Sequence, residues 1–147
     1  MGRRGLFGTW SHRNGDERAA WTRYTWRMRD HKTLHAWQGA RDVASGCIRH
    51  ADRHWSPARG ALFDQVRRAA ISVQLNLAEG YALGTPALFR RHVRSAYGSA
   101  VETTDALELL RDHGDRPDDS IDQLITSSRR SQALLLGLLR KLERSSP

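Results

Sequence analysis

Residues 65–80 read QVRRAAISVQLNLAEG, and the spacing of their apolar side chains predicts an amphipathic helix. At 100° per residue, the core-facing stripe consists of Val66, Ala69, Ala70, Val73 and Leu77. A second apolar stripe, well away from the first, consists of Ile71, Leu75, Ala78 and Ala82. Because a surface helix of a monomer needs only one apolar stripe, the second stripe predicts self-association through this helix. The alternative is a single wide stripe that serves a tightly packed bundle.

A line of polar residues runs between the two apolar stripes. This polar seam consists of Gln65, Arg68, Ser72, Asn76 and Glu79. We expect the seam to form hydrogen bonds within a bundle or between subunits, where a buried polar group can define the register of packed helices. One glutamate beside an asparagine and a serine is a poor metal site, because metal ions need several converging carboxylates or histidines. The sequence predicts no catalytic residue, no metal and no cofactor.

Three prolines divide the rest of the chain into helical segments. Pro57 and Pro86 each follow a Ser or Thr suited to an N-cap, and Pro117 precedes two aspartates that favour a helix N-terminus. The predicted helices span about 33–53, 57–80, 86–113 and 117–144. Connections of a few residues favour antiparallel neighbours. The predicted fold class is therefore all-α, an antiparallel up-down-up-down four-helix bundle.

Two further features of these segments bear on packing. Leu134 and Leu138 fall outside the core stripe of the fourth segment, so we place them at the oligomer interface with Ile71, Leu75 and the polar seam. In the third segment, Gly98 lies in mid-helix, where glycine is about 1 kcal/mol less favourable than alanine. We expect this glycine to mark a close helix crossing.

Residues 1–30 differ from the remainder, which we assign as the bundle domain, residues 31–147. The first 30 residues hold seven arginines against three acidic residues, with tryptophans that follow no helical or strand period. This composition predicts a disordered basic extension. The alternative is that translation starts at Met28.

The composition of the 147-residue chain excludes several classes of protein. Its one cysteine, Cys47, excludes an intrachain disulfide and a zinc site built from cysteines. No stretch approaches the roughly 20 continuous apolar residues of a membrane span, and no apolar signal segment follows the N-terminus. These features predict a cytoplasmic protein without a membrane partner.

The formal net charge of +8 favours a polyanionic partner, RNA or DNA, although an arginine-rich codon bias is an alternative explanation. The charge is uneven: residues 53–100 hold seven arginines against two acidic residues, whereas residues 101–123 hold eight acidic residues against two arginines. The candidate phosphate-binding residues are Arg67, Arg90, Arg91, Arg94, Arg129, Arg130, Arg140 and Lys141. Arg67 has the clearest orientation toward an exposed partner. The alternative is that these are solvated side chains or members of weak surface ion pairs.

Four stretches together carry a family likeness: LHAWQGA (34–40), QVRRAAISVQLNLAEG (65–80), FRRHVRSAYGSAVET (89–103) and LLLGLLRKL (134–142). They resemble the four-helix-bundle family of proteins encoded in 23S rRNA intervening sequences, which includes the accessory variability protein of diversity-generating retroelements. The chain departs from the family pattern at Gln74, where proline is usual, at Ala58, where an acidic residue is usual, and at His54-Trp55, which replaces Phe-Pro. The resemblance implies a pentameric ring, and for the retroelement relatives it implies binding to a reverse transcriptase and nucleic acid.

A catalytic alternative rests on RHADRH (49–54), in which Arg49 and His54 have the spacing of the HEPN-type ribonucleases. Such a spacing is expected about once by chance in a chain so rich in arginine and histidine. The histidines that we expect to be dispersed surface or packing residues are His35, His50, His92 and His113. The sequence therefore favours a non-catalytic oligomeric scaffold that binds nucleic acid or a nucleic-acid enzyme. A protein–protein interaction module without a nucleic-acid role is the alternative, and a ribonuclease is a remote one.

Overall fold

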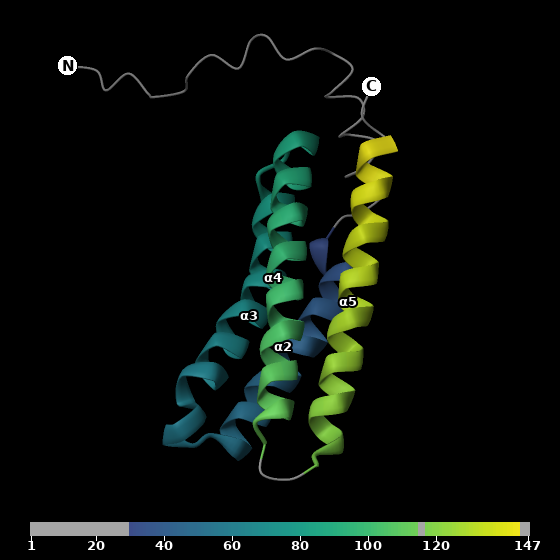
Figure 1. The fold of residues 1–147 in the computed structure, drawn as a ribbon. Coiled ribbons are helices and arrows are strands. Elements are labelled where there is room, and N and C mark those ends of the chain that lie inside the picture. The colour runs from purple at the N-terminus through teal and green to yellow at the C-terminus, as the bar shows by residue number, and fades with distance from the viewer. Residues whose placement is uncertain (1–29, 115–116, 145–147) are drawn as a thin grey trace, which may run out of the picture.

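The computed structural model describes residues 30–114 and 117–144, and all regular structure in these ranges is helical (Figure 1). The elements are η1 (His31–Thr33), α2 (His35–His54), η2 (Pro57–Arg59), α3 (Gly60–Ala82), α4 (Pro86–Asp112) and α5 (Asp119–Arg144). The prediction of an all-α chain with four long helices is confirmed. None of the described helices combines the length and apolarity that a membrane span requires. The predicted extension and the alternative start at Met28 fall on residues 1–29, outside the described part of the chain.

The predicted start signals act at two helices in different ways. Thr85 caps α4, because its hydroxyl accepts a hydrogen bond from the Leu88 amide at 3.2 Å and Pro86 occupies the first turn. Ser56 makes no such bond, and Pro57 opens the short 3₁₀ turn η2 instead. Helix α3 therefore begins at Gly60, three residues later than the segment predicted from the sequence.

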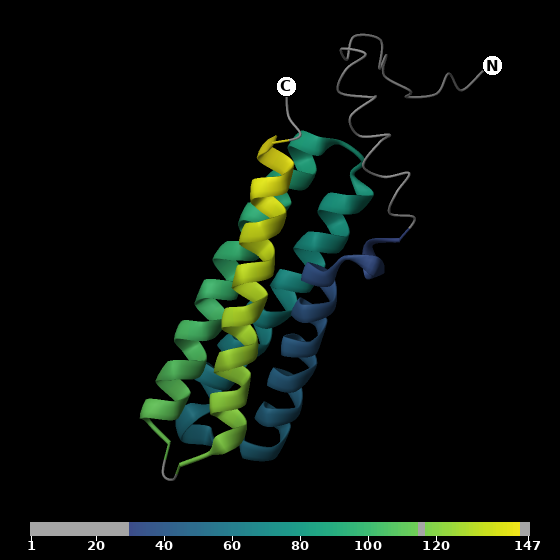
Figure 2. The same cartoon turned by 90° about the vertical axis from the view of Figure 1, so that its right-hand side faces the viewer.

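Each long helix packs against two others: α3 contacts α2 and α4, and α5 contacts α4 and α2. Figure 1 places the α2–α3 connection and the facing ends of α4 and α5 at the lower end, whereas α3 and α4 are joined at the upper end. The turn at that upper end contains Gly84, whose positive φ of 71° suits glycine in the turn after a helix. Figure 2 shows the four helices side by side along the same long axis.

The core consists of two apolar clusters stacked along that axis. The upper cluster joins Trp37 of α2 to Leu77 of α3, Phe89 of α4 and Leu135 of α5. The lower cluster joins Cys47 of α2 to Phe63, Leu107 and Ile125, among others. The N-terminal half of α2 thus packs with the C-terminal halves of α3 and α5.

The structure corrects the interpretation of the fourth segment. Leu138 is only 9% exposed and belongs to the upper core cluster, so its placement outside the core is wrong. Leu134 is half-buried and packs on the same cluster, where its side chain faces Gly39 of α2. The apolar face of α5 is wide because this helix contacts both α2 and α4.

The close helix crossing lies at Gly80 rather than Gly98. A Cβ at Gly80 would lie 2.4 Å from the Cβ of His92 and 3.2 Å from the Phe89 ring, so α3 and α4 approach there closely enough to require glycine. Gly98 is exposed, and apart from its own helix no described residue has an atom within 4 Å of the position of its missing Cβ. The prediction for Gly98 is therefore wrong.

Candidate functional site

The polar seam lies at the boundary between α3 and α4 and finds its partners within the chain. The hydroxyls of Ser72 and Ser99 are 3.0 Å apart. The Asn76 amide donates to the Ser72 carbonyl at 2.9 Å, and its oxygen lies 3.2 Å from Nδ1 of His92. Since that oxygen can only accept, His92 carries its proton on Nδ1 in this contact. The seam therefore joins two helices of the same chain.

The two ends of the seam are more exposed. Gln65 donates a hydrogen bond to Glu102 of α4, and Arg68 donates to Gln65 at 2.8 Å. At the other end, Glu79 lies 3.9 Å from His92. The sequence-based prediction of the polar seam did not include its partners on α4. These partners, His92, Ser99 and Glu102, follow one another at helical spacings of seven and three residues.

The second apolar stripe of α3 remains in part exposed. Leu75 is 57% exposed and Ile71 is 37% exposed. An ion pair between Asp52 and Arg67, at 2.8 Å, sets α2 against α3 one turn below. Ile48, also 37% exposed, lies one helical turn before Asp52 on α2, and Ile71 lies one turn after Arg67 on α3. We call Ile48, Ile71 and Leu75 the apolar patch.

Arg67 does not face an exposed partner, so that prediction is wrong. Its guanidinium contacts Asp52 at 2.8 Å and Asp64 at 3.4 Å, and only 29% of its side chain is exposed. Arg67 therefore joins α2 to α3. The sequence placed it on α3 but could not show which neighbouring helix its side chain would meet.

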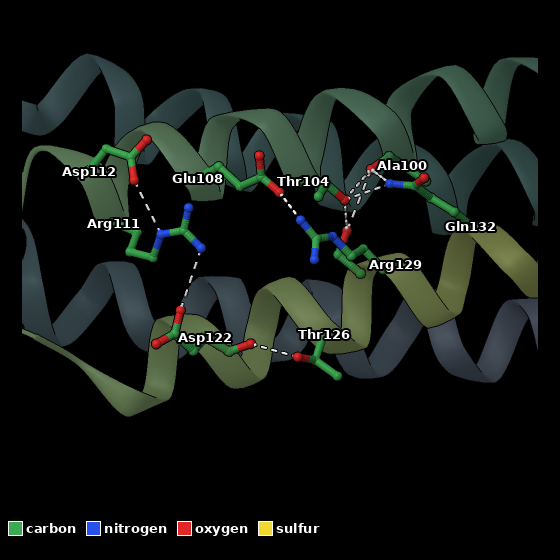
Figure 3. A network of polar contacts seen from close by, with 10 residues as sticks. Ala100, Thr104, Glu108, Arg111, Asp112, Asp122, Thr126, Arg129 and Gln132 are labelled. Carbon is green, nitrogen blue, oxygen red and sulfur yellow. Dashed lines mark hydrogen bonds and ion pairs between the residues drawn. The ribbon is translucent and has the colours of Figure 1, made fainter.

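Ion pairs lie along the boundary between α4 and α5, part of which Figure 3 shows, and two of their arginines, Arg94 and Arg129, are candidate residues. Arg129 contacts Glu108 at 2.6 Å, and Arg111 contacts Asp122 at 3.7 Å. Further along this boundary, Arg94 contacts Glu143 at 3.3 Å. These pairs are exposed, so each contributes at most about 1 kcal/mol to stability.

A buried polar network also crosses this boundary. Thr104 is the central residue: its hydroxyl lies 2.7 Å from that of Ser128 and accepts a hydrogen bond from the Gln132 amide at 2.6 Å (Figure 3). Thr104 and Ser128 are both buried. Buried hydroxyls that bond to each other in this way define the register of α4 against α5.

Basic side chains gather at the upper end of α4 and α5. This basic end consists of Arg90, Arg91, Arg94, Arg140, Lys141 and Arg144. The Arg94–Glu143 contact brings the first turns of α4 beside the last turns of α5, so the helix ends that carry the six cations are adjacent. Arg144 is a residue that the sequence-based list missed. Arg130 is exposed in the middle of α5, between the basic end and the acidic first turn.

A separate cluster lies at the opposite end, where α2 ends and α5 begins. His50 and His54, one turn apart on α2, stack with ring centroids 4.5 Å apart. Each has a ring nitrogen 3.8 Å from Oδ2 of Asp118: Nδ1 of His50 and Nε2 of His54. The cluster lines an open cleft together with Arg59 and Arg111. We call His50, His54 and Asp118 the histidine cluster.

The electrostatics of the cluster follow from its geometry. His50 is 8% exposed, and its burial, followed by the neighbouring His54, lowers its pKa, whereas Asp118 acts in the opposite direction. The pKa of Asp118 is lowered mainly by its hydrogen bond from the Ser120 hydroxyl, at 2.6 Å. Among the described residues, these three offer a group of ligand atoms within 4.8 Å of one another. The i,i+4 spacing of His50 and His54 was the signal that the sequence analysis passed over; Arg49 does not line the cleft.

The fold and these surfaces define the chain as a small all-helical protein whose α4 and α5 carry basic side chains at one end and acidic side chains at the other. The family model described as 23S rRNA-intervening sequence protein matches residues 32–137, so the chain belongs to that family and the resemblance read from the sequence is confirmed.

Comparison with solved structures agrees with the fold. The chain is similar to the crystal structure of a protein with unknown function from the S23 ribosomal protein family of Bacteroides thetaiotaomicron VPI-5482. The TM-score is 0.60 at 17% sequence identity, and the match covers 71% of this chain and 97% of that chain. No curated protein matches. The similarity supports the helical fold and says nothing about activity.

Proposed function

We propose that the chain is a non-catalytic scaffold that self-associates and binds the phosphate backbone of nucleic acid at its basic end. Its four helices form an antiparallel up-down-up-down bundle. The two core clusters support this arrangement, because each combines opposite halves of helices that follow one another in the sequence. In this topology the start of α4 and the end of α5 meet, which places the basic end on one surface.

The observation that carries the proposal is the composition of the basic end. Six cations occupy the first turns of α4 and the last turns of α5, and Glu143 is the one acidic residue within these turns. Arginine donates bidentate hydrogen bonds to phosphate oxygens, and lysine supplies a point charge. Binding through such contacts depends on salt and is independent of base sequence.

Self-association is the second part of the proposal and rests on the apolar patch. Exposed leucine and isoleucine side chains on one face of α2 and α3 favour burial against another copy. A pentameric ring, as the family resemblance implies, would present five basic ends to one nucleic acid and so strengthen binding by multivalency.

Fluorescence anisotropy with labelled duplex RNA and DNA tests the basic end. We expect affinity to fall steeply between about 50 and 200 mM salt, and the log–log salt slope to decrease by about one for each phosphate contact removed. The variant Arg91→Gln/Arg140→Gln removes two cations from the basic end. The matched control Arg49→Gln/Arg53→Gln removes the same charge from exposed positions on α2.

The two variants separate a located site from a general effect of charge. Weaker binding and a smaller slope in Arg91→Gln/Arg140→Gln alone would support the basic end. Equal losses in both variants would refute that location. Absence of binding by the wild-type chain at low salt would remove the nucleic-acid function and leave an interaction module.

Light scattering coupled to size exclusion tests the apolar patch. Leu75→Glu is expected to reduce the mass of the assembly toward that of a monomer, because it places a charge in the buried contact. Leu109→Glu is the matched control, since Leu109 is a leucine of similar exposure on α4. A monomeric wild-type chain, or an unchanged mass in Leu75→Glu, would contradict self-association through this face.

A further inference from the structure

The histidine cluster has the composition of a metal site. It brings two imidazole nitrogens and one carboxylate oxygen together from α2 and the residue preceding α5. Two histidines and a carboxylate are a ligand set used for zinc, with a further position left for water or another ligand. The same donors suit other first-row transition metals.

We propose that His50, His54 and Asp118 form a binding site for a divalent transition-metal ion of the zinc class. The ligand atoms are Nδ1 of His50, Nε2 of His54 and Oδ2 of Asp118. Nδ1 of His50 also lies 3.2 Å from the Ser120 hydroxyl, a contact that a bound ion would replace. Two ligands one turn apart on a helix and a third from a neighbouring element form a common framework for such an ion. The site lies at the end of the bundle opposite the basic end and does not depend on the proposed function.

The spacing of these atoms fits an ion after a small adjustment. Bonds of about 2.0–2.1 Å in a tetrahedral site place ligand atoms roughly 3.3 Å apart. Both nitrogens of the cluster lie 3.8 Å from the Asp118 oxygen. His54 is exposed, so rotation of its ring can bring its Nε2 closer to Oδ2 of Asp118. His50 is buried, so closing its separation from Oδ2 by about 0.5 Å requires a movement of Asp118.

Hydrogen bonds from Ser120 hold Asp118 in the orientation that a ligand needs. Oδ1 of Asp118 accepts from the Ser120 amide at 2.9 Å and from its hydroxyl at 2.6 Å. These bonds occupy Oδ1 and leave Oδ2 toward the two imidazoles. Second-sphere bonds of this kind fix the direction of a metal ligand and reduce the reorganisation on binding.

The surroundings of the cluster allow an ion to enter. The cleft is open, and its wall includes Arg59, Arg111 and Asp122. The charge of Arg111 is balanced by Asp112, at 3.2 Å, and by Asp122, at 3.7 Å, so this guanidinium opposes a bound cation less than an unpaired one would. An arginine-lined cleft also offers a place for an anionic ligand at the open position of the ion.

Zinc titration of the full chain, stripped with a chelator and measured against a chromophoric competitor, tests the site. We expect one ion per chain with a dissociation constant tighter than about 10 µM. His54→Ala removes a ligand from an exposed position, and Asp118→Asn keeps an oxygen for the Ser120 bonds while losing the carboxylate. Each is expected to weaken binding at least about 10-fold, whereas the matched control His35→Ala, exposed at the start of α2, is expected to bind as wild type does.

Cobalt substitution adds a readout that ordinary surface binding does not give. A tetrahedral site is expected to produce visible absorption bands of Co²⁺ that disappear in both His54→Ala and Asp118→Asn. Circular dichroism establishes that each variant remains helical. The proposal is overturned if the wild-type dissociation constant is weaker than about 10 µM, if either variant retains wild-type affinity, or if His35→Ala loses as much affinity as they do.

Discussion

Two glycine-to-alanine substitutions provide a matched test of how α3 packs on α4. Gly80 and Gly98 both lie within long helices, so replacing either by alanine gains the same helix propensity. Their surroundings are opposite. A Cβ at Gly80 would lie 2.4 Å from Cβ of His92, and this neighbouring atom is anchored to the α4 backbone. A Cβ at Gly98 would meet no atom of another described residue within 4 Å outside its own helix.

The magnitudes follow from these two environments. Gly98→Ala is expected to raise the free energy of unfolding by about 0.5–1 kcal/mol, the propensity difference between glycine and alanine. Gly80→Ala makes the same gain but also overpacks the helix crossing, which costs about 1–3 kcal/mol. The propensity term cancels between the variants. We therefore expect Gly80→Ala to be less stable than Gly98→Ala by about 1–3 kcal/mol.

Urea denaturation followed by circular dichroism measures this difference. All variants are compared at a single protein concentration, since the proposed self-association would make apparent stability depend on concentration. Thermal unfolding gives a second reading, with a shift of roughly 4 °C per kcal/mol for a domain of this size. Destabilisation by Gly98→Ala would show that its helix face is covered. Stabilisation by Gly80→Ala would show that α3 and α4 leave room for a Cβ at this position.

Two further predictions concern buried groups. Thr104→Val keeps the shape of the side chain but leaves the hydroxyl of Ser128 and the amide of Gln132 without this partner, so we expect the free energy of unfolding to fall by about 1–3 kcal/mol in urea denaturation. Thr126→Val, at an exposed position on α5, is the control and should change the free energy of unfolding by less than about 0.5 kcal/mol. Equal effects of the two substitutions would contradict a buried network. Burial raises the pKa of the Cys47 thiol to about 12, so at pH 8 iodoacetamide should modify Cys47 slowly in the folded chain and rapidly in urea. Rapid stoichiometric modification without denaturant would mean that the core around this thiol is open.

Local sequence signals were sufficient for much of the helical framework. The Thr85–Pro86 pair marks the start of α4, and the core stripe of residues 65–80 is buried as its spacing predicted. At Ser56–Pro57 the same kind of signal produced only a 3₁₀ turn. A capping motif permits a helix start, but the packing that follows decides whether the helix begins there.

The candidate surfaces depended more strongly on tertiary structure. The sequence identified the polar seam but left open whether its partners would lie in the same chain or another, and the structure places Ser99 and His92 beside it. Similarly, sequence spacing suggested that Arg67 is exposed, whereas its guanidinium lies against Asp52 of α2. Periodicity defines the faces of one helix and contains no information about which residue of another helix lies opposite.

Helical period, caps and prolines act over a few residues, so the sequence alone determined that this protein is all-helical and where most of its helices lie. The four stretches of family likeness also determined to which family it is related. Only the tertiary structure decided that Gly80 rather than Gly98 marks the close crossing and that Asp118 joins His50 and His54. These contacts depend on the rotation and register of whole helices against one another. That rotation and register are set by the combined packing of side chains distant in the sequence, so no single stretch of residues specifies them.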